Sequence, residues 1–211
     1  MALRLGDEAP DFVAPTTVGP IQFHAWLGDS WGILFSHPAD YTPVCTTELG
    51  VAAKMKPLFD QRNVKLIAIS VDSLRSHMGW ILDINETQGI KLNFPIIADP
   101  DRTVSLLYDM IPPQATNANT VRSLFVISPA KRIELVLTYP ASTGRNFNEL
   151  LRAVDSLQLA AEYPVVTPAN WHYGDDCIVS PAVSDTEMLK LFPKGARRVK
   201  SYLRYTPQPN A

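Results

Sequence analysis

Cys45 is the residue of this sequence best placed for chemistry, because it stands directly before a segment whose apolar residues have helical spacing. The free N–H groups and the dipole at a helix N-terminus favour a thiolate over a thiol. A thiolate is a nucleophile, so this position predicts a reactive cysteine. The alternative is a structural cysteine that is buried as a small apolar side chain, which is the commoner role of a single cysteine.

The cysteine count limits the other kinds of chemistry. Cys45 and Cys177 are the two cysteines, too few for a disulfide framework. Neither has a second cysteine or a histidine at zinc-finger spacing, so no metal site is expected. For Cys177 we expect a small apolar side chain in a short C-terminal strand, although a disulfide between subunits stays open.

The elements around Cys45 must position it. Residues 31–36 form a short apolar run bounded by turn-forming residues, which predicts a buried strand. Residues 37–44 then read as a loop with two prolines, and residues 46–62 as a helix capped by Thr46 or Thr47. Pro57 is expected to kink or end that helix.

The rest of the chain alternates strands with helices. Strands are predicted at residues 64–71, 94–98, 122–127 and 133–138, and helices at 75–88, 102–109 and 146–160. We expect Met78, Ile81, Leu82 and Asn85 on one side of the helix at 75–88, which Asp72 and Ser73 would cap. Residues 1–30 read as irregular or weakly extended. This order predicts an α/β protein with a thioredoxin-like fold, a central mixed sheet flanked by helices and an extended C-terminal segment.

Composition changes near Tyr163, where prolines become frequent and a basic stretch occupies residues 194–200. We therefore predict a domain at residues 1–164 and a C-terminal segment at 165–211. A segment of this length broken by prolines is too short to form its own core, which favours docking on a partner surface.

Charge and hydropathy exclude several classes of function. The chain is 46% hydrophobic and 19% charged, with a formal net charge of -2, so neither disorder nor attraction to nucleic acid is expected. Apolar runs are far shorter than the roughly 18 residues that span a bilayer. No secretory signal is readable in the first twenty residues, and we expect a reducing compartment, the cytoplasm.

The residues before Cys45 carry a resemblance to a known family. The segment Pro38-Ala39-Asp40-Tyr41-Thr42-Pro43-Val44-Cys45 is similar to the peroxiredoxin signature, which has a proline, a threonine and the peroxidatic cysteine at this spacing. The flanking residues 35–38 and 44–50 look like the one-cysteine branch of that family. Further similar segments cover nearly the whole chain, and they lie at residues 70–73, 94–99, 139–140, 143–146 and 170–171.

The resemblance implies a thiol-dependent peroxidase that reduces hydrogen peroxide and alkyl hydroperoxides through a cysteine sulfenic acid. Cys45 would attack the peroxide, Thr42 and Arg122 would position it, and Pro38 would shield the sulfur from water. A guanidinium stays cationic at working pH, so Arg122 could favour the thiolate and also donate to the peroxide. The alternative for Arg122 is a surface salt bridge. No metal or organic cofactor is needed, because the cysteine itself is oxidised and reduced.

Three other residues have supporting roles under this resemblance. His37 matches a histidine that one-cysteine members carry beside the site, where it would be either a structural residue or a proton relay. Glu48 could pair with Arg122 or Arg145, or could instead be an exposed helix carboxylate. Arg145 matches a second arginine of the family.

The route back to the thiol is also implied by the resemblance. Two-cysteine members carry a resolving cysteine near the C-terminus, and Thr167 occupies that position here. We therefore expect an external thiol or a reductant protein, of unknown identity, to reduce the sulfenic acid. A homodimer, in which the C-terminal segment packs against the second subunit, is a further inference from the family.

Two alternatives remain open. Gly28-Asp29-Ser30-Trp31-Gly32 matches the pattern of serine hydrolases, and some one-cysteine relatives are credited with phospholipase activity there. Ser30 precedes the predicted strand and the expected acidic partner is missing, so a turn is favoured. The other alternative is a peroxide sensor or a redox-regulated holdase that uses the oxidation of Cys45 as a switch.

Overall fold

The computed structural model describes residues 3–114 and 119–211, and these form two compact units, residues 1–147 and 148–211. The predicted boundary between residues 164 and 165 lies just after the first helix of the second unit and stays a prediction. Among the described residues, no helix is both long and apolar enough to cross a membrane.

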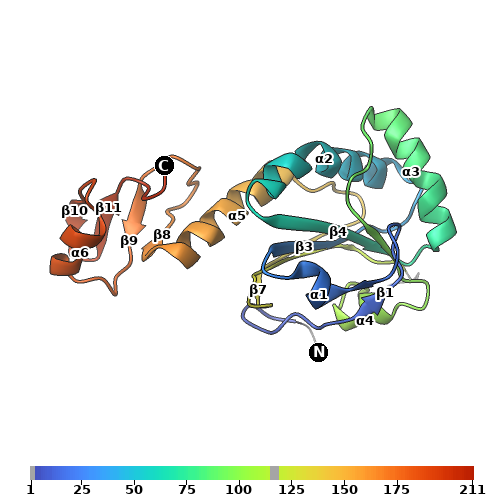
Figure 1. Cartoon of the computed structure of the whole chain (residues 1–211), viewed down its shortest axis with the longest axis horizontal. Helices are drawn as coiled ribbons and strands as arrows, with labels where there is room; N and C mark the ends of the chain where they lie inside the picture. The colour runs from blue at the N-terminus through green and yellow to red at the C-terminus, as the bar shows by residue number, and fades with distance from the viewer. Residues whose placement is uncertain (1–2, 115–118) are drawn as a thin grey trace. The chain divides into compact units, whose positions relative to one another are not determined.

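The first unit is built on a five-stranded sheet of order β5-β4-β3-β6-β7, and three of its strands, β3, β4 and β7, are labelled in Figure 1. The central strand β3 pairs in parallel with β4 and antiparallel with β6, so the predicted mixed sheet is confirmed. β3 is almost entirely buried, as its apolar run indicates. The strands are β3 (Trp31–Ser36), β4 (Val64–Ser70), β5 (Ile96–Ala98), β6 (Arg122–Ile127) and β7 (Ile133–Tyr139).

Helix α2 (Pro43–Asp60) differs from the prediction at its start and does not end at Pro57. It begins earlier than expected, because Pro43 takes the first helical position, where its missing N–H costs no hydrogen bond. It also continues through Pro57. The carbonyl of Ala53, four residues before Pro57, receives a hydrogen bond of 3.1 Å from the side-chain amide of Asn93, which replaces the bond that proline cannot make.

Helix α3 (Leu74–Gln88) begins at its predicted cap but buries a different face. The Ser73 side chain accepts a hydrogen bond from the backbone N–H of Ser76. The buried residues are His77, Trp80 and Ile84, whereas Met78 and Leu82 are 51% and 68% exposed. The side that carries Met78 and Leu82 is therefore not the one that packs inward, because the rings of His77 and Trp80 pack against His37 in the loop that follows β3.

The N-terminal residues contain short extended segments, which the sequence allowed, and a helix that it did not predict. A two-stranded ribbon, β1 (Val13–Ala14) and β2 (Ile21–Gln22), is followed by the short helix α1 (Phe23–Leu27). Phe12 stacks on Phe23 with ring centroids 4.8 Å apart, so aromatic packing orders this stretch despite its prolines. The remaining helix of this unit is α4 (Thr103–Leu107).

The second unit, residues 148–211, has a core of its own, whereas the sequence predicted that residues 165–211 would be too short to form one. Helix α5 (Phe147–Glu162) contributes Leu159 to this core, and Trp171 supplies a large fully buried side chain. These two residues compensate for the shortness of the segment. The other elements are β8 (Val165–Val166), β9 (Cys177–Val179), α6 (Asp185–Leu191), β10 (Arg197–Lys200) and β11 (Leu203–Thr206), and the sheet order is β10-β11-β9-β8.

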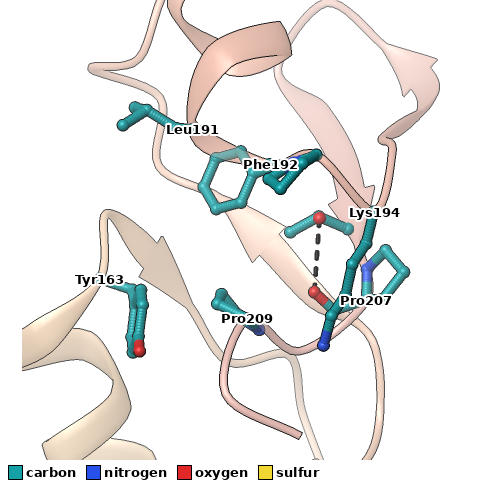
Figure 2. A pocket seen from close by; sticks show the side chains of 8 residues that line it. Tyr163, Leu191, Phe192, Lys194, Pro207 and Pro209 are labelled. Atoms are coloured by element: carbon teal, nitrogen blue, oxygen red, sulfur yellow. Dashed lines mark hydrogen bonds between the residues drawn. The ribbon is translucent and has the colours of Figure 1, made fainter.

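A pocket of the second unit lies between Tyr163, Phe192 and the prolines near the C-terminus (Figure 2). The ammonium group of Lys194 donates hydrogen bonds to the carbonyls of Gln208 (3.1 Å) and Ala211 (2.6 Å). The C-terminal residues are thereby held against the wall of this pocket.

Candidate active site

Cys45 lies in the first turn of α2 and is fully buried. Thr42 is the residue that precedes the helix, so Cys45 is its third helical residue and does not stand before it as expected. Thr46 and Thr47 donate their hydroxyls to the carbonyls of Thr42 and Val44, both at 2.8 Å, and do not cap the helix. The sulfur therefore lies close to the positive end of the helix dipole.

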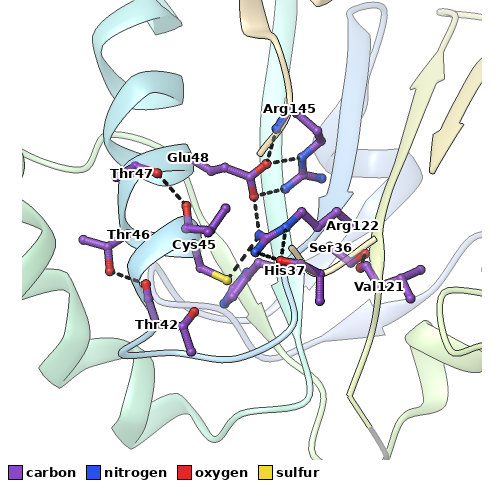
Figure 3. A network of polar contacts seen from close by, with 12 residues as sticks. Ser36, His37, Thr42, Cys45, Thr46, Thr47, Glu48, Val121, Arg122 and Arg145 are labelled. Atoms are coloured by element: carbon purple, nitrogen blue, oxygen red, sulfur yellow. Dashed lines mark hydrogen bonds and ion pairs between the residues drawn. The ribbon is translucent and has the colours of Figure 1, made fainter. Parts of the chain in front are cut away.

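Arg122, the first residue of β6, reaches the sulfur (Figure 3). Its Nη1 atom lies 3.3 Å from Sγ of Cys45 and 2.7 Å from a carboxylate oxygen of Glu48. Its Nε and Nη2 atoms donate to the carbonyl of Ala141 at 3.1 and 2.6 Å. Arg122 is buried, so the alternative of a surface salt bridge does not describe it.

Glu48 pairs with both arginines, as the sequence suggested for either one. It accepts hydrogen bonds of 2.8 Å from Nε, Nη2 and the backbone N–H of Arg145. Burial of the Glu48 carboxyl would raise its pKa, but the hydrogen bonds and charge of Arg145, with the charge of Arg122, lower it. Two cations therefore surround one buried carboxylate beside the sulfur.

Arg145 is fixed on its other sides as well. Its Nη1 donates to the carbonyl of Ser123 at 3.1 Å, and its guanidinium lies 5.0 Å from the ring centroid of Phe35. Every part of this guanidinium thus has a partner in the core of the first unit.

Thr42 and Pro38 lie in the loop between β3 and α2. The Thr42 hydroxyl donates to the carbonyl of Ala39 at 2.8 Å, so its oxygen keeps its lone pairs for a further donor. Pro38 is half-buried, two residues after the end of β3. An open groove passes beside this loop, and its walls are Tyr41, Thr42, Pro43, Thr46, Thr47, Trp80, Asp83, Thr87 and Gln88.

His37 belongs to a buried cluster that includes two residues to which the sequence assigned no role. Asp40 accepts hydrogen bonds from Nε2 of His37 at 3.0 Å and from Nδ1 of His77 at 2.8 Å. The potential ligand atoms of these three residues all lie within 4.8 Å of one another, a spacing that a metal ion could use. Asp40 stood in the motif, but nothing in the sequence indicated that His77 would join it.

The serine hydrolase pattern does not form a catalytic dyad here. The Ser30 hydroxyl donates to the side-chain carbonyl of Asn63 at 2.7 Å, whereas Nε2 of His24 bonds to the carbonyl of Ala9 at 2.7 Å. Ser30 also comes directly before β3 and not after a strand. Lys131 donates to the carbonyl of Gly28, so a cation lies near this turn where a hydrolase would need a carboxylate.

Cys177 is the first residue of β9 and is fully buried, as expected for a small apolar side chain. Burial raises the pKa of its thiol, and the charges of Asp175 and Asp176 add to this effect. Such a thiol is a poor nucleophile.

Comparison with family models supports the same chemistry. Residues 5–136 match the model of the AhpC/TSA family, and residues 156–195 match the C-terminal domain of 1-Cys peroxiredoxin. Together these two matches extend over most of both units.

Individual relatives match nearly the whole of this chain. A 1-Cys peroxiredoxin of Dictyostelium discoideum is 58% identical over 99% of this chain and 86% of its own, and Peroxiredoxin-6 of Rattus norvegicus is 53% identical over 98% of both. The solved structure of a C45S mutant of the Peroxiredoxin 6 of Arenicola marina superposes with a TM-score of 0.92 at 46% identity over 100% of both chains. A yeast mitochondrial 1-Cys peroxiredoxin, solved to explain thiol resolution via the glutathione and thioredoxin systems, gives 0.92 at 50% identity over 97% and 99%. The chain holds a buried cysteine that an arginine contacts at the start of a helix, and it resembles these proteins over nearly all of its own length. It therefore belongs to the peroxiredoxin family of thiol-dependent peroxidases.

Proposed function

We propose that Cys45 is the peroxidatic nucleophile of this enzyme. Its thiolate sulfur attacks one oxygen of hydrogen peroxide or of an alkyl hydroperoxide, and the O–O bond breaks. The other oxygen leaves as hydroxide or alkoxide and takes up a proton, while the sulfur becomes a sulfenic acid.

The observation that carries this proposal is the 3.3 Å contact between Nη1 of Arg122 and Sγ of Cys45. A guanidinium at that distance favours the thiolate, and the buried setting strengthens the attraction. The same cation stabilises the negative charge that develops on the departing oxygen, which is the largest contribution in most reactions of this kind.

Thr42 and Pro38 complete the peroxide site in this proposal. The hydroxyl of Thr42 spends its hydrogen on the carbonyl of Ala39, so its oxygen is available to accept the O–H of the peroxide. Pro38 covers the loop side of the pocket without offering a donor that would compete for the sulfur.

Glu48 and Arg145 hold Arg122 in place. Glu48 shares one carboxylate oxygen between Nη1 of Arg122 (2.7 Å) and Nη2 of Arg145 (2.8 Å), which fixes the plane of the first guanidinium. Neither Glu48 nor Arg145 is assigned a contact with the peroxide.

The reductant is a thiol from outside the chain, of the glutathione or thioredoxin type that the yeast relative is described as using. Thr167 stands where two-cysteine members carry the resolving cysteine. Cys177 is buried with a raised pKa and therefore attacks the sulfenic acid poorly. We also propose a homodimer formed through residues 165–211 and work in the reducing cytoplasm.

Peroxide turnover with an added thiol distinguishes the role of Cys45 from that of Cys177. Replacing Cys177 by serine is expected to leave peroxide consumption within about twofold of wild type, because the side chain is outside the reaction. Cys45→Ser should lower it by at least about a thousandfold. The measurement is steady-state peroxide loss with glutathione or with a thioredoxin system.

Consumption of a single equivalent of peroxide with every reductant would contradict an enzymatic role and favour the sensor or holdase alternative. Loss of turnover in Cys177→Ser, with an unchanged melting temperature, would contradict the external route. Sedimentation tests the proposed homodimer. The molecular mass of the full chain is compared with that of a chain that ends at residue 164.

A further inference from the structure

A buried group of charged and polar side chains connects the loop between β3 and α2 to helix α3, and we call it the Asp40 cluster. It consists of His37 and Asp40 from the loop and of Ser76 and His77 from α3. His37 and His77 are fully buried and Asp40 is 7% exposed. No role in the peroxide reaction has been given to Asp40, Ser76 or His77.

Asp40 accepts hydrogen bonds on both carboxylate oxygens. Oδ1 receives Nε2 of His37 at 3.0 Å, and Oδ2 receives Nδ1 of His77 at 2.8 Å and the hydroxyl of Ser76 at 2.7 Å. Burial would raise the pKa of the Asp40 carboxyl, but the hydrogen bonds from His37 and His77 outweigh burial and lower it. Asp40 is therefore a carboxylate, which can accept and cannot donate.

His77 must donate from both ring nitrogens. Its Nδ1 faces the carboxylate of Asp40, and its Nε2 faces the backbone carbonyl of Ile97 at 3.1 Å. Because both partners are acceptors only, a hydrogen is needed on each nitrogen. The geometry thus makes both nitrogens of His77 donors, and the ring bridges the Asp40 carboxylate and the Ile97 carbonyl.

His37 has one nitrogen fixed and the other without a partner. The carboxylate of Asp40 requires the hydrogen on Nε2, and none of the described residues offers a hydrogen bond to Nδ1. Burial lowers the pKa of His37, with the charge of His77 opposing protonation further, so the ring is neutral. Its Nδ1 is then a bare acceptor in the protein interior, a state that is costly unless a donor arrives.

This acceptor belongs to the loop between β3 and α2, which also carries Pro38 and Thr42 of the proposed peroxide site. The His37 ring packs on Trp80 with centroids 5.0 Å apart, and the indole N–H of Trp80 donates to the Thr46 hydroxyl next to Cys45. Figure 3 labels His37 among the residues drawn around Cys45. A hydroxyl of the peroxide or of its product could supply the donor that Nδ1 lacks.

We propose that Asp40 and His77 are positioning residues that hold His37 in the Nε2–H tautomer, so that Nδ1 stays a free acceptor for a hydroxyl at the peroxide site. His77 donates to Asp40, and Asp40 dictates where the hydrogen of His37 resides. The consequence for activity rests on the proposed function, but the tautomer itself does not.

A metal ion is the competing occupant of this cluster. Two imidazoles and a carboxylate are acceptable ligands for zinc. Each of the three groups already spends its facing atom on a hydrogen bond of 2.8 to 3.0 Å, however, and a metal would have to replace the hydrogens that those bonds require. The hydrogen-bonded state is therefore the one inferred.

Nitrogen-15 NMR of histidine-labelled wild-type protein tests the assignment directly, because the two ring nitrogens give separate signals for each tautomer. We expect His37 as the Nε2–H tautomer and His77 with both nitrogens protonated at neutral pH. The opposite tautomer at His37, a neutral His77, or signals of both rings that shift on addition of zinc alone would overturn the proposal.

Asp40→Asn supplies the causal test. The two donors at Oδ2 orient the amide so that its NH2 group faces His37, which forces the hydrogen of His37 onto Nδ1. The tautomer signal should switch, and the rate of the first peroxide step should fall about tenfold, the value of one hydrogen bond. Ser76→Ala removes a donor from the same carboxylate without reversing it, so neither readout should move.

The outcomes distinguish a failure of the positioning role from a failure of the proposed function. An unchanged tautomer in folded Asp40→Asn would refute the positioning role, and so would a switched tautomer with an unchanged peroxide rate. If Asp40→Asn does not fold, the wild-type spectrum still decides the assignment. A wild-type protein with the expected spectrum but no peroxide turnover would refute the proposed function and leave the tautomer standing.

Discussion

Replacing Arg122 by glutamine is expected to slow the reaction of Cys45 with hydrogen peroxide by about 100- to 1,000-fold, the effect of removing one preorganised donor from a developing anion. The guanidinium touches the sulfur at 3.3 Å and has no cationic substitute at that contact among the described residues. Glutamine keeps a donor but removes the charge. The measurement is the second-order rate of the first peroxide step, followed in single-turnover experiments.

Two further variants show whether the charge or the shape of the Arg122 side chain determines the rate of the first peroxide step. Arg122→Lys keeps the charge but cannot contact Cys45, Glu48 and Ala141 together, so it should recover only part of the lost rate. Arg75→Gln, which removes an exposed cation from α3, is the matched control and should react like wild type. A wild-type rate in folded Arg122→Gln would rule out the assigned role of this residue.

The second large effect concerns stability. Glu48→Gln is expected to lower the free energy of unfolding by about 3–5 kcal/mol, because it leaves two buried guanidinium groups without their counter-charge. Asp60→Asn in the same helix breaks the exposed ion pair with Lys56 and should cost less than about 1 kcal/mol. Denaturant unfolding of both variants provides the comparison, and equal losses would contradict the assigned network.

The same carboxylate predicts a pH dependence. The pKa of Glu48 is lower in the folded protein than its ordinary value of 4.5, so the unfolded chain takes up the proton at higher pH. Its stabilising contribution is complete above pH 4.5 and is lost as the pH falls toward the folded value. Wild type should therefore lose stability below pH 4.5 more steeply than Glu48→Gln, and parallel curves would contradict this reasoning.

The sequence predicted the strands of the central sheet well, since β3 and β6 are apolar runs whose burial is visible in composition alone. It also predicted that Cys45 lies at a helix start, but not that the helix begins at Pro43. Proline reads both as a loop residue and as a first helical residue, and the pattern alone does not choose between them.

Other features depended on partners distant in sequence. The passage of α2 through Pro57 needs the amide of Asn93, and the Asp40 cluster needs His77, which lies 37 residues after Asp40. The apolar spacing of α3 favoured Met78 and Leu82, whereas packing buried His77 and Trp80. Polar networks between elements do not follow from local periodicity, because their members share neither spacing nor hydropathy.

Mass spectrometry after one equivalent of hydrogen peroxide, in the presence of a trap for sulfenic acid, tests most directly that Cys45 alone performs the chemistry. We expect the trap to label Cys45 and to leave Cys177 unlabelled, and we expect the same labelling of Cys45 in Cys177→Ser. An unlabelled Cys45, or a disulfide between Cys45 and Cys177, would contradict it.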